Sequence, residues 1–201
     1  MWRKNRRVNR NSNCVGVDPN RNFPVDWQGS TNDACDETFR GASAGSEPEV
    51  QGLMGVVKNA VAKQGVKLFV DYHSYSQVMC VRKYTLRSLF NFGLTLTSTA
   101  YGYDCEASPD NEAALAKLAD GTVQAISGSN GVKYEAGNTC QVVGASSGGS
   151  DDWSLKYGGA EYAYTIELRD TGAHGFVLPP EQILPTGKEN WEGVKYMLKN
   201  L

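Results

Sequence analysis

Two polar residues stand at the ends of largely apolar segments in this sequence, His73 and Glu167. His73 follows the run Lys67–Tyr72, and Glu167 lies near the end of Tyr162–Leu168, in which apolar side chains alternate along the chain. An imidazole can bind a metal ion or carry a proton, and a carboxylate can act as a base. The only other histidine is His174, so a site built from three histidines is excluded. On spacing alone, a structural role for His73 is favoured over a role as a ligand.

Both segments have the length and composition of β-strands, and helix signals surround them. Ser46–Glu49 forms a capping box that predicts a helix ending at Gly65, Ser108 and Pro109 predict the start of a second helix, and Thr186–Glu189 predicts a C-terminal one. Apolar residues at helical spacing are expected to face the core: Val50, Leu53, Met54, Val57, Ala60 and Val61, then Ala113, Leu115, Leu118, Val123 and Ile126, then Trp191, Val194, Met197, Leu198 and Leu201. Alternating strands and helices predict an α/β sheet covered by helices, with ligands bound beyond the carboxyl ends of the strands.

The composition excludes several classes of protein. Of 201 residues, 40% are hydrophobic and 21% are charged, which is typical of a globular domain. The formal charge is -2 and the pI is near 5.7, so there is no cationic surplus to neutralise phosphates, and nucleic acid is not expected as a partner. Apolar runs are far shorter than the roughly 20 residues that cross a bilayer, so no membrane partner is expected. The basic N-terminus precedes no apolar stretch, so no secretory signal is expected in this chain.

Several motifs occur in the order that is found in one enzyme family. His73–Gln77 follows the first predicted strand, Glu167–Gly172 ends the second, and Val17–Asn22 precedes both. Further matching segments are Trp2–Lys4, Cys14–Asp18, Cys35–Gly41, Gly148–Trp153 and Gly175–Phe176. Together they resemble the zinc carboxypeptidases of the carboxypeptidase A and B type. The resemblance covers the chain except residues 81–100 and implies an α/β fold with a mixed, mostly parallel sheet flanked by helices.

The resemblance implies roles for three residues in peptide-bond cleavage. His73 matches the third zinc ligand of the family, Glu167 matches its general base, and Arg3 matches the arginine that polarises the scissile carbonyl. Zinc lowers the pKa of a bound water to about 7, and a nearby carboxylate can then take the proton. The implied cofactor is therefore zinc.

Five further residues match positions that bind the substrate, which the resemblance implies to be a peptide or protein C-terminus. Asn20 and Arg21 match the pair that grips the terminal carboxylate, for which the guanidinium fork is suited. Tyr75 and Phe176 match residues that line the pocket. Asp151 matches the residue at the bottom of the side-chain pocket, where a carboxylate would favour C-terminal Lys or Arg. The alternative for Asp151 is an acidic residue in the first turn of a helix.

The chain also departs from the family pattern. The first two zinc ligands of the family come from an H-x-x-E motif upstream of the residue matched by Arg3, and this motif is absent from the sequence. Asp18 matches the aspartate that orients the missing histidine. Because zinc at a catalytic site needs three protein ligands, one histidine is not enough, and the chain is expected to be impaired or inactive. A non-catalytic module that binds peptide C-termini is the alternative function.

The same departures suggest a single, partial catalytic domain over residues 1–201, truncated at its N-terminus. An exposed sheet edge and an uncovered apolar face are then expected, and with them poor solubility. Residues 81–100 interrupt the resemblance and are interpreted as a translated intron or an inserted loop. Gly144 takes the place of the mobile tyrosine that closes over substrate in the family.

A serine hydrolase is the less favoured alternative. Gly144–Gly148 matches Gly-x-Ser-x-Gly, with Ser146 as nucleophile and Asp170 and His174 downstream. Such a match is common by chance in a chain with 22 glycines, and Asp170 and His174 are too close in sequence to resemble the usual separated triad partners.

The five cysteines include no C-x-x-C pair, which favours disulfide bonds over a zinc ribbon. The resemblance implies a disulfide bond between Cys14 and Cys35, suggests a second between Cys105 and Cys140, and leaves Cys80 unpaired. Disulfides form in oxidising compartments, so the full-length parent protein is expected to be extracellular.

Overall fold

The computed structural model describes residues 1–81, 102–104, 109–142 and 144–201. Apart from Val81, the proposed insertion at residues 81–100 therefore lies outside the described residues, as do Cys105 and Ser108. The proposed pairing of Cys105 with Cys140 stays a prediction.

The described residues form two compact units, each made of two stretches of chain. The first comprises Met1–Phe69 and Ala145–Ala163, and the second comprises Val70–Gly144 and Tyr164–Leu201. Two strands, β1 (Val66–Ser74) and β4 (Ala160–Leu168), run from one unit into the other. Across the described ranges, every helix is too short or too polar to traverse a lipid bilayer.

The first unit consists largely of loops with short helical turns, as the many turn-forming residues in the first forty positions predict. Its helices are η1 (Pro19–Arg21), η2 (Trp27–Gly29), α1 (Pro48–Gln64), α4 (Ser150–Trp153) and η3 (Ser154–Gly158). Phe23 and Trp153 are both buried, with ring centroids 5.9 Å apart. These rings place the end of α4 against the loop that follows η1.

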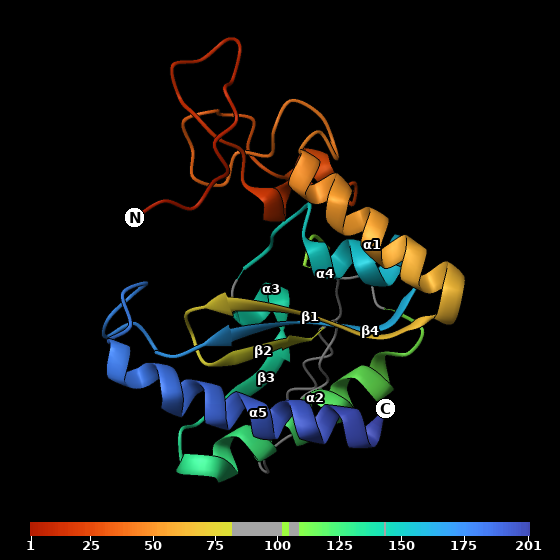
Figure 1. Cartoon of the computed structure of the whole chain (residues 1–201), viewed down its shortest axis with the longest axis vertical. Coiled ribbons are helices and arrows are strands. Elements are labelled where there is room, and N and C mark those ends of the chain that lie inside the picture. The colour runs from red at the N-terminus through yellow and green to blue at the C-terminus, as the bar shows by residue number, and fades with distance from the viewer. Residues whose placement is uncertain (82–101, 105–108, 143) are drawn as a thin grey trace, which may run out of the picture. The chain divides into compact units, whose positions relative to one another are not determined.

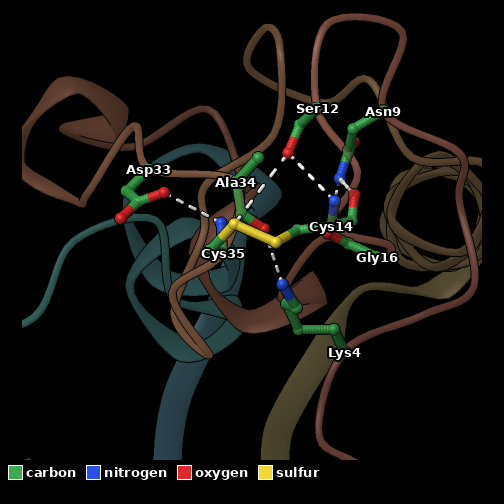
Figure 2. The surroundings of a disulfide bond; sticks show 8 residues. All are labelled: Lys4, Asn9, Ser12, Cys14, Gly16, Asp33, Ala34 and Cys35. Atoms are coloured by element: carbon green, nitrogen blue, oxygen red, sulfur yellow. Dashed lines mark hydrogen bonds between the residues drawn. A yellow bond between two sulfur atoms is a disulfide. The ribbon is translucent and has the colours of Figure 1, made fainter.

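A disulfide bond between Cys14 and Cys35 ties two of these loops together, as predicted (Figure 2). The Lys4 ammonium donates a hydrogen bond to the Ala34 carbonyl at 2.8 Å, and the Asn9 amide donates to the Cys14 carbonyl at 3.0 Å. The crosslink is thus embedded in hydrogen bonds that join the N-terminal segment to both of its ends.

The start of α1 differs from the capping box that the sequence predicts. Glu47, rather than Ser46, is the N-cap residue, and its side chain makes no capping hydrogen bond. The Ser46 hydroxyl instead donates to Glu47 Oε1 at 2.6 Å, and the Asn5 amide donates to Glu47 Oε2 at 2.7 Å. The Glu47 side chain is fully buried. Because a buried carboxylate is costly unless it accepts hydrogen bonds, Ser46 and Asn5 donate to it, and the Ser46 hydroxyl does not cap the helix. The end of α1 is as predicted, because Gly65 follows it with a φ of 80°.

The second unit is built on a mixed sheet. Its strands are ordered β1-β4-β2-β3, with β2 at Val78–Val81 and β3 at Glu135–Asn138. Strand β2 is parallel to β3 and antiparallel to β4, which confirms a mixed sheet. The helices of this unit are α2 (Glu112–Asn130), α3 (Thr139–Val142), η4 (Pro180–Gln182) and α5 (Ile183–Asn200).

Helices α2 and α5 pack against each other through glycines, and Figure 1 shows them running close together. A Cβ atom at Gly121 of α2 would overlap the Tyr196 ring of α5, and one at Gly193 of α5 would lie 2.7 Å from Ile126 of α2. Gly121 lies within a helix because this close approach needs it. Of the predicted core residues of α2, Leu115, Leu118, Val123 and Ile126 are buried. Ala113, in the first turn of the helix, is exposed.

Other element boundaries correct the sequence predictions. Helix α2 begins at Glu112 with Asn111 as its N-cap, three residues after Pro109. Helix α5 begins at Ile183, so Thr186 lies inside the helix and is not its cap. The Thr186 hydroxyl donates to the Gln182 carbonyl one turn earlier, a bond that a hydroxyl within a helix can make in place of capping.

Several predicted core residues are exposed. Leu53 of α1 is 38% exposed, and Trp191 and Leu198 of α5 are 57% and 63% exposed. The buried face of α5 carries Thr186, Glu189, Asn190, Gly193 and Met197. A polar set of this kind can be buried because its members hydrogen-bond to one another and to neighbouring elements, which apolar periodicity does not record. Strand β1 is the terminal strand of the sheet, and its side chains are half-buried or exposed even though Lys67–Tyr72 is largely apolar.

Candidate active site

Strands β1 and β4 are neighbours, and they bring His73 and Glu167 together. His73 Nδ1 lies 3.9 Å from Glu167 Oε1, and His73 Nε2 lies 3.0 Å from Asp71 Oδ2. The side chains of His73 and Glu167 are 21% and 15% exposed, so water can reach both. His73 is the penultimate residue of β1, so it lies at the end of the strand as predicted, with one more strand residue after it.

Asp71 was missed by sequence reasoning. Residues two apart on a strand point to the same face, so the spacing of Asp71 and His73 was a usable signal. With Nε2 facing Asp71, Nδ1 is the ring nitrogen that faces Glu167. A carboxylate on one nitrogen of an imidazole fixes the ring orientation, as in sites where histidine binds a metal through the other nitrogen.

These residues do not complete a zinc site. Zinc at a catalytic site takes three protein ligands, usually imidazoles and carboxylates. His73 supplies one imidazole, and both of its ring nitrogens face carboxylates within 4 Å. In the part of the chain that the structure describes, no group of three His, Cys, Asp or Glu residues is arranged to hold a metal ion.

The loop after β4 contacts the turn after β1 through an aromatic pair and contains a hydrogen bond between Asp170 and His174. The rings of Tyr75 and Phe176 meet edge to face with centroids 4.9 Å apart, so the structure brings these two predicted pocket residues together. His174 Nδ1 lies 2.6 Å from Asp170 Oδ2. This hydrogen bond, with one from the Gly172 N–H, lowers the pKa of Asp170. Ser146 belongs to the other unit, and the serine hydrolase alternative stays a prediction.

A buried network anchors the chain two residues beyond Glu167. The carboxylate of Glu189 in α5 is fully buried and accepts hydrogen bonds from both Nε and Nη2 of Arg169. It also accepts from the Asn130 amide at 2.7 Å and the Tyr134 hydroxyl at 3.0 Å. The bond to Glu189 raises the pKa of Arg169, and burial raises the pKa of Tyr134. Sequence reasoning assigned Glu189 to a capping box and so missed this role.

The first unit holds the predicted carboxylate-binding residues close together in sequence and space. Arg3 Nε donates to Asp18 Oδ2 at 2.8 Å, and Asp18 Oδ1 accepts from the Asn20 N–H at 3.0 Å. The Asn20 side-chain oxygen accepts from the Ser150 N–H at 2.8 Å, which joins η1 to the start of α4. Arg21 Nη1 donates to the Asn20 carbonyl at 2.7 Å.

Burial and charge shape this cluster. Burial lowers the pKa of the Arg21 guanidinium, and the positive charge of Arg3 acts in the same direction. The negative charges of Asp18, Asp151 and Asp152 oppose the shift. A cation in this surrounding can attract an anionic ligand, because burial reduces the screening of its charge.

Asp151 is buried in the first turn of α4. Its Oδ1 accepts the Asp152 N–H at 2.8 Å, and a negative charge is favoured in the first turn of a helix. A Cβ atom at Gly149 would lie 3.0 Å from Asp151 Oδ1, so the backbone before α4 approaches this carboxylate closely. Gly144 has a φ of 93°, which favours glycine over the tyrosine of the family pattern.

Comparison with known proteins identifies the family of this chain. Residues 1–193 match the family model for zinc carboxypeptidase. The chain belongs to the zinc carboxypeptidase family. A metallocarboxypeptidase A-like protein of Trichophyton verrucosum is 41% identical to this chain, and the match covers 100% of the chain. Mouse carboxypeptidase A4 is 37% identical, and its match also covers 100% of the chain.

Solved structures of carboxypeptidases share the fold. Bovine thrombin-activatable fibrinolysis inhibitor, in complex with tick carboxypeptidase inhibitor, matches 100% of this zinc carboxypeptidase chain with a TM-score of 0.83 and 31% identity. Carboxypeptidase A from Helicoverpa armigera matches 99% of the chain with a TM-score of 0.80 and 30% identity. The chain covers 63% and 46% of those two chains, and 44% and 43% of the Trichophyton and mouse proteins. It therefore spans less than half the length of these two curated relatives.

Proposed function

We propose that this chain carries part of the site of a metallocarboxypeptidase, an enzyme that releases C-terminal amino acids from peptides. The observation that carries the proposal is the approach of His73 Nδ1 to Glu167 Oε1 at 3.9 Å in a member of this family. In this proposal His73 would supply one ligand to a zinc ion, and Glu167 would be the general base that takes a proton from water. Arg3 stabilises the negative charge that develops on the carbonyl oxygen.

Substrate recognition is assigned to polar residues of η1 and α4 and to two aromatic residues in the loops after β1 and β4. Asn20 and Arg21 would bind the terminal carboxylate, with Tyr75 and Phe176 lining the pocket for the last side chain. Asp151 would pair with a C-terminal Lys or Arg, and its burial supports this because a cation there would be little screened by water. The domain is proposed to be one partial catalytic domain over residues 1–201, and the disulfide bond between Cys14 and Cys35 supports an extracellular parent protein.

The cleavage activity of the 201-residue chain is proposed to be impaired or absent. The described residues supply His73 as an imidazole ligand and do not complete a zinc site. A non-catalytic module that binds peptide C-termini through Arg3, Asn20 and Arg21 is therefore the second candidate function. The half-buried guanidinium of Arg21, which donates a hydrogen bond to the Asn20 carbonyl, is the observation that favours it.

Metal content and peptide release separate the two candidates. The purified chain is dialysed with zinc, its zinc is measured by mass spectrometry, and peptides ending in Lys, Arg, Phe or Leu are followed by chromatography. The enzyme predicts one zinc per chain and release that chelation stops. The module predicts peptide binding without metal and without release.

Two variants sharpen this experiment. Glu167→Gln removes the base, and any release should fall at least about 100-fold. Glu161→Gln is the matched control, because Glu161 lies on the same strand and forms an exposed ion pair with Lys67. Rapid labelling of Ser146 by a fluorophosphonate would instead support the serine hydrolase. A lower rate or affinity for Lys-ending peptides than for Leu-ending ones would contradict the role of Asp151.

A further inference from the structure

Asp18 stands at the centre of the cluster around η1, and both of its carboxylate oxygens are engaged there. Oδ2 accepts from Arg3 Nε at 2.8 Å, and Oδ1 accepts from the Asn20 N–H at 3.0 Å. The Asp18 side chain is only 3% exposed, whereas that of Arg3 is 36% exposed. A nearly buried carboxylate therefore holds an arginine whose head can still be reached from water.

Each bond of Asp18 positions a different part of the cluster. Through Oδ1, Asp18 is the N-cap of η1 and holds the turn that presents Asn20 and Arg21. Through Oδ2, it grips Arg3 at Nε, so this bond uses neither of the two terminal amino groups of the guanidinium. Arginine can bridge two carboxylates because its donors form a rigid fork.

We propose that Asp18 is the positioning residue for recognition of the peptide terminal carboxylate, because it fixes Arg3 relative to the turn that carries Asn20 and Arg21. The inference rests on the proposed binding of peptide C-termini by this chain. It differs from the role that the family pattern gives Asp18, which is to orient a histidine that this sequence lacks. Here the partner of Asp18 is Arg3.

Asp18→Asn separates the two bonds. The asparagine oxygen can still accept the Asn20 N–H, and asparagine is a good N-cap residue, so the turn should persist. Its amide nitrogen would then face Arg3 Nε, and two donors cannot bond to each other. Asp33→Asn is the matched control, because Asp33 Oδ1 likewise accepts the N–H two residues on, at Cys35, in an exposed loop of the same unit.

The experiment measures affinity by calorimetry for one peptide with a free C-terminal carboxylate and for the same peptide as its C-terminal amide. The wild-type chain should prefer the acid, and Asp18→Asn should reduce this preference by about tenfold, the usual effect of losing a hydrogen bond to a charged group. Asp33→Asn should keep the full preference. In an Arg3→Gln background, Asp18→Asn should have no further effect, because Asp18 acts through Arg3.

The outcomes distinguish this inference from the proposed function. If the wild-type chain does not prefer the acid, the proposed recognition of C-termini is wrong and the role of Asp18 is lost with it. If the wild-type chain prefers the acid and Asp18→Asn does so equally, only the inference on Asp18 is overturned. An equal effect of Asp18→Asn with and without Arg3 also overturns it.

A second variant decides the matter if Asp18→Asn does not fold, as judged by circular dichroism. Arg3→Lys keeps the positive charge but has a single ammonium group, which cannot hold Asp18 from one nitrogen while presenting two others. It should lose as much acid preference as Arg3→Gln. Full preference in Arg3→Lys would show that charge alone suffices and would overturn the positioning role.

Discussion

His73 Nδ1 faces Glu167 Oε1 at 3.9 Å across the neighbouring strands β1 and β4, while Asp71 lies on the other ring nitrogen. The family uses such an imidazole and carboxylate around zinc, yet the described residues of this chain do not assemble a metal site. Backbone pairing of the strands and the carboxylate of Asp71 hold the histidine in place.

Removal of metal should consequently leave the fold unchanged. A metal that binds only the folded state raises the melting temperature, and its removal lowers it. We expect EDTA to shift the thermal midpoint of the chain by less than about 2 °C, measured by calorimetry with and without added zinc. A larger drop, restored by zinc alone, would contradict the conclusion that the described residues do not complete a zinc site.

Loss of the disulfide bond should destabilise the first unit. Cys14 and Cys35 are 21 residues apart in sequence, and crosslinking a loop of this size stabilises by about 3 kcal/mol, largely through the unfolded chain. The double variant Cys14→Ser, Cys35→Ser should lower the free energy of unfolding by this amount in urea. Reduction of the wild-type chain should have the same effect, while the double variant should not respond to reductant. Equal stability of oxidised and reduced wild type would refute the prediction.

Glu189→Gln should be strongly destabilising. Its fully buried carboxylate pairs with Arg169 and also accepts from Asn130 and Tyr134. Neutralising one partner of a buried pair leaves the other charge without compensation, which costs about 3–5 kcal/mol. Urea unfolding measures the loss. Glu192→Gln on the same helix is the control, because its pair with Lys195 is exposed and should contribute less than about 1 kcal/mol. Similar losses in the two variants would argue against the network.

The hydrogen bond between Asp170 and His174 in the loop after β4 should be visible in the titration of Asp170. The hydrogen bond with His174 is the largest cause that lowers the pKa of Asp170 below its ordinary value of 3.8. The folded state then binds fewer protons than the unfolded state at this group. Its contribution to stability is complete above pH 3.8 and is lost as the pH falls through the lower folded value.

His174→Ala should therefore raise the pKa of Asp170 towards 3.8, measured by NMR titration of the side-chain carboxyl carbon. The Gly172 N–H should keep part of the shift. Asp36 provides an internal reference, because its pKa is lowered by Thr38 and should not change. An unchanged Asp170 pKa in His174→Ala would mean that the loop backbone alone sets it.

Local sequence signals were enough to predict several helix and strand ends, the family and one disulfide bond. Gly65 ends α1 because it adopts a positive φ, and the alternation of Tyr162–Leu168 places Glu167 near the end of β4. The motifs around His73 and Cys14 were sufficient to recognise the family and the disulfide bond. Such features depend on residues near one another in sequence, so pattern and spacing record them.

The partners of buried charges were decided by the tertiary structure. Glu189 pairs with Arg169 and Glu47 accepts from Asn5, although both glutamates sit in sequence patterns typical of helix caps. Asp18 binds Arg3, 15 positions away. A buried carboxylate takes the donors that packing brings to it, and packing joins distant segments whose encounter no local pattern encodes.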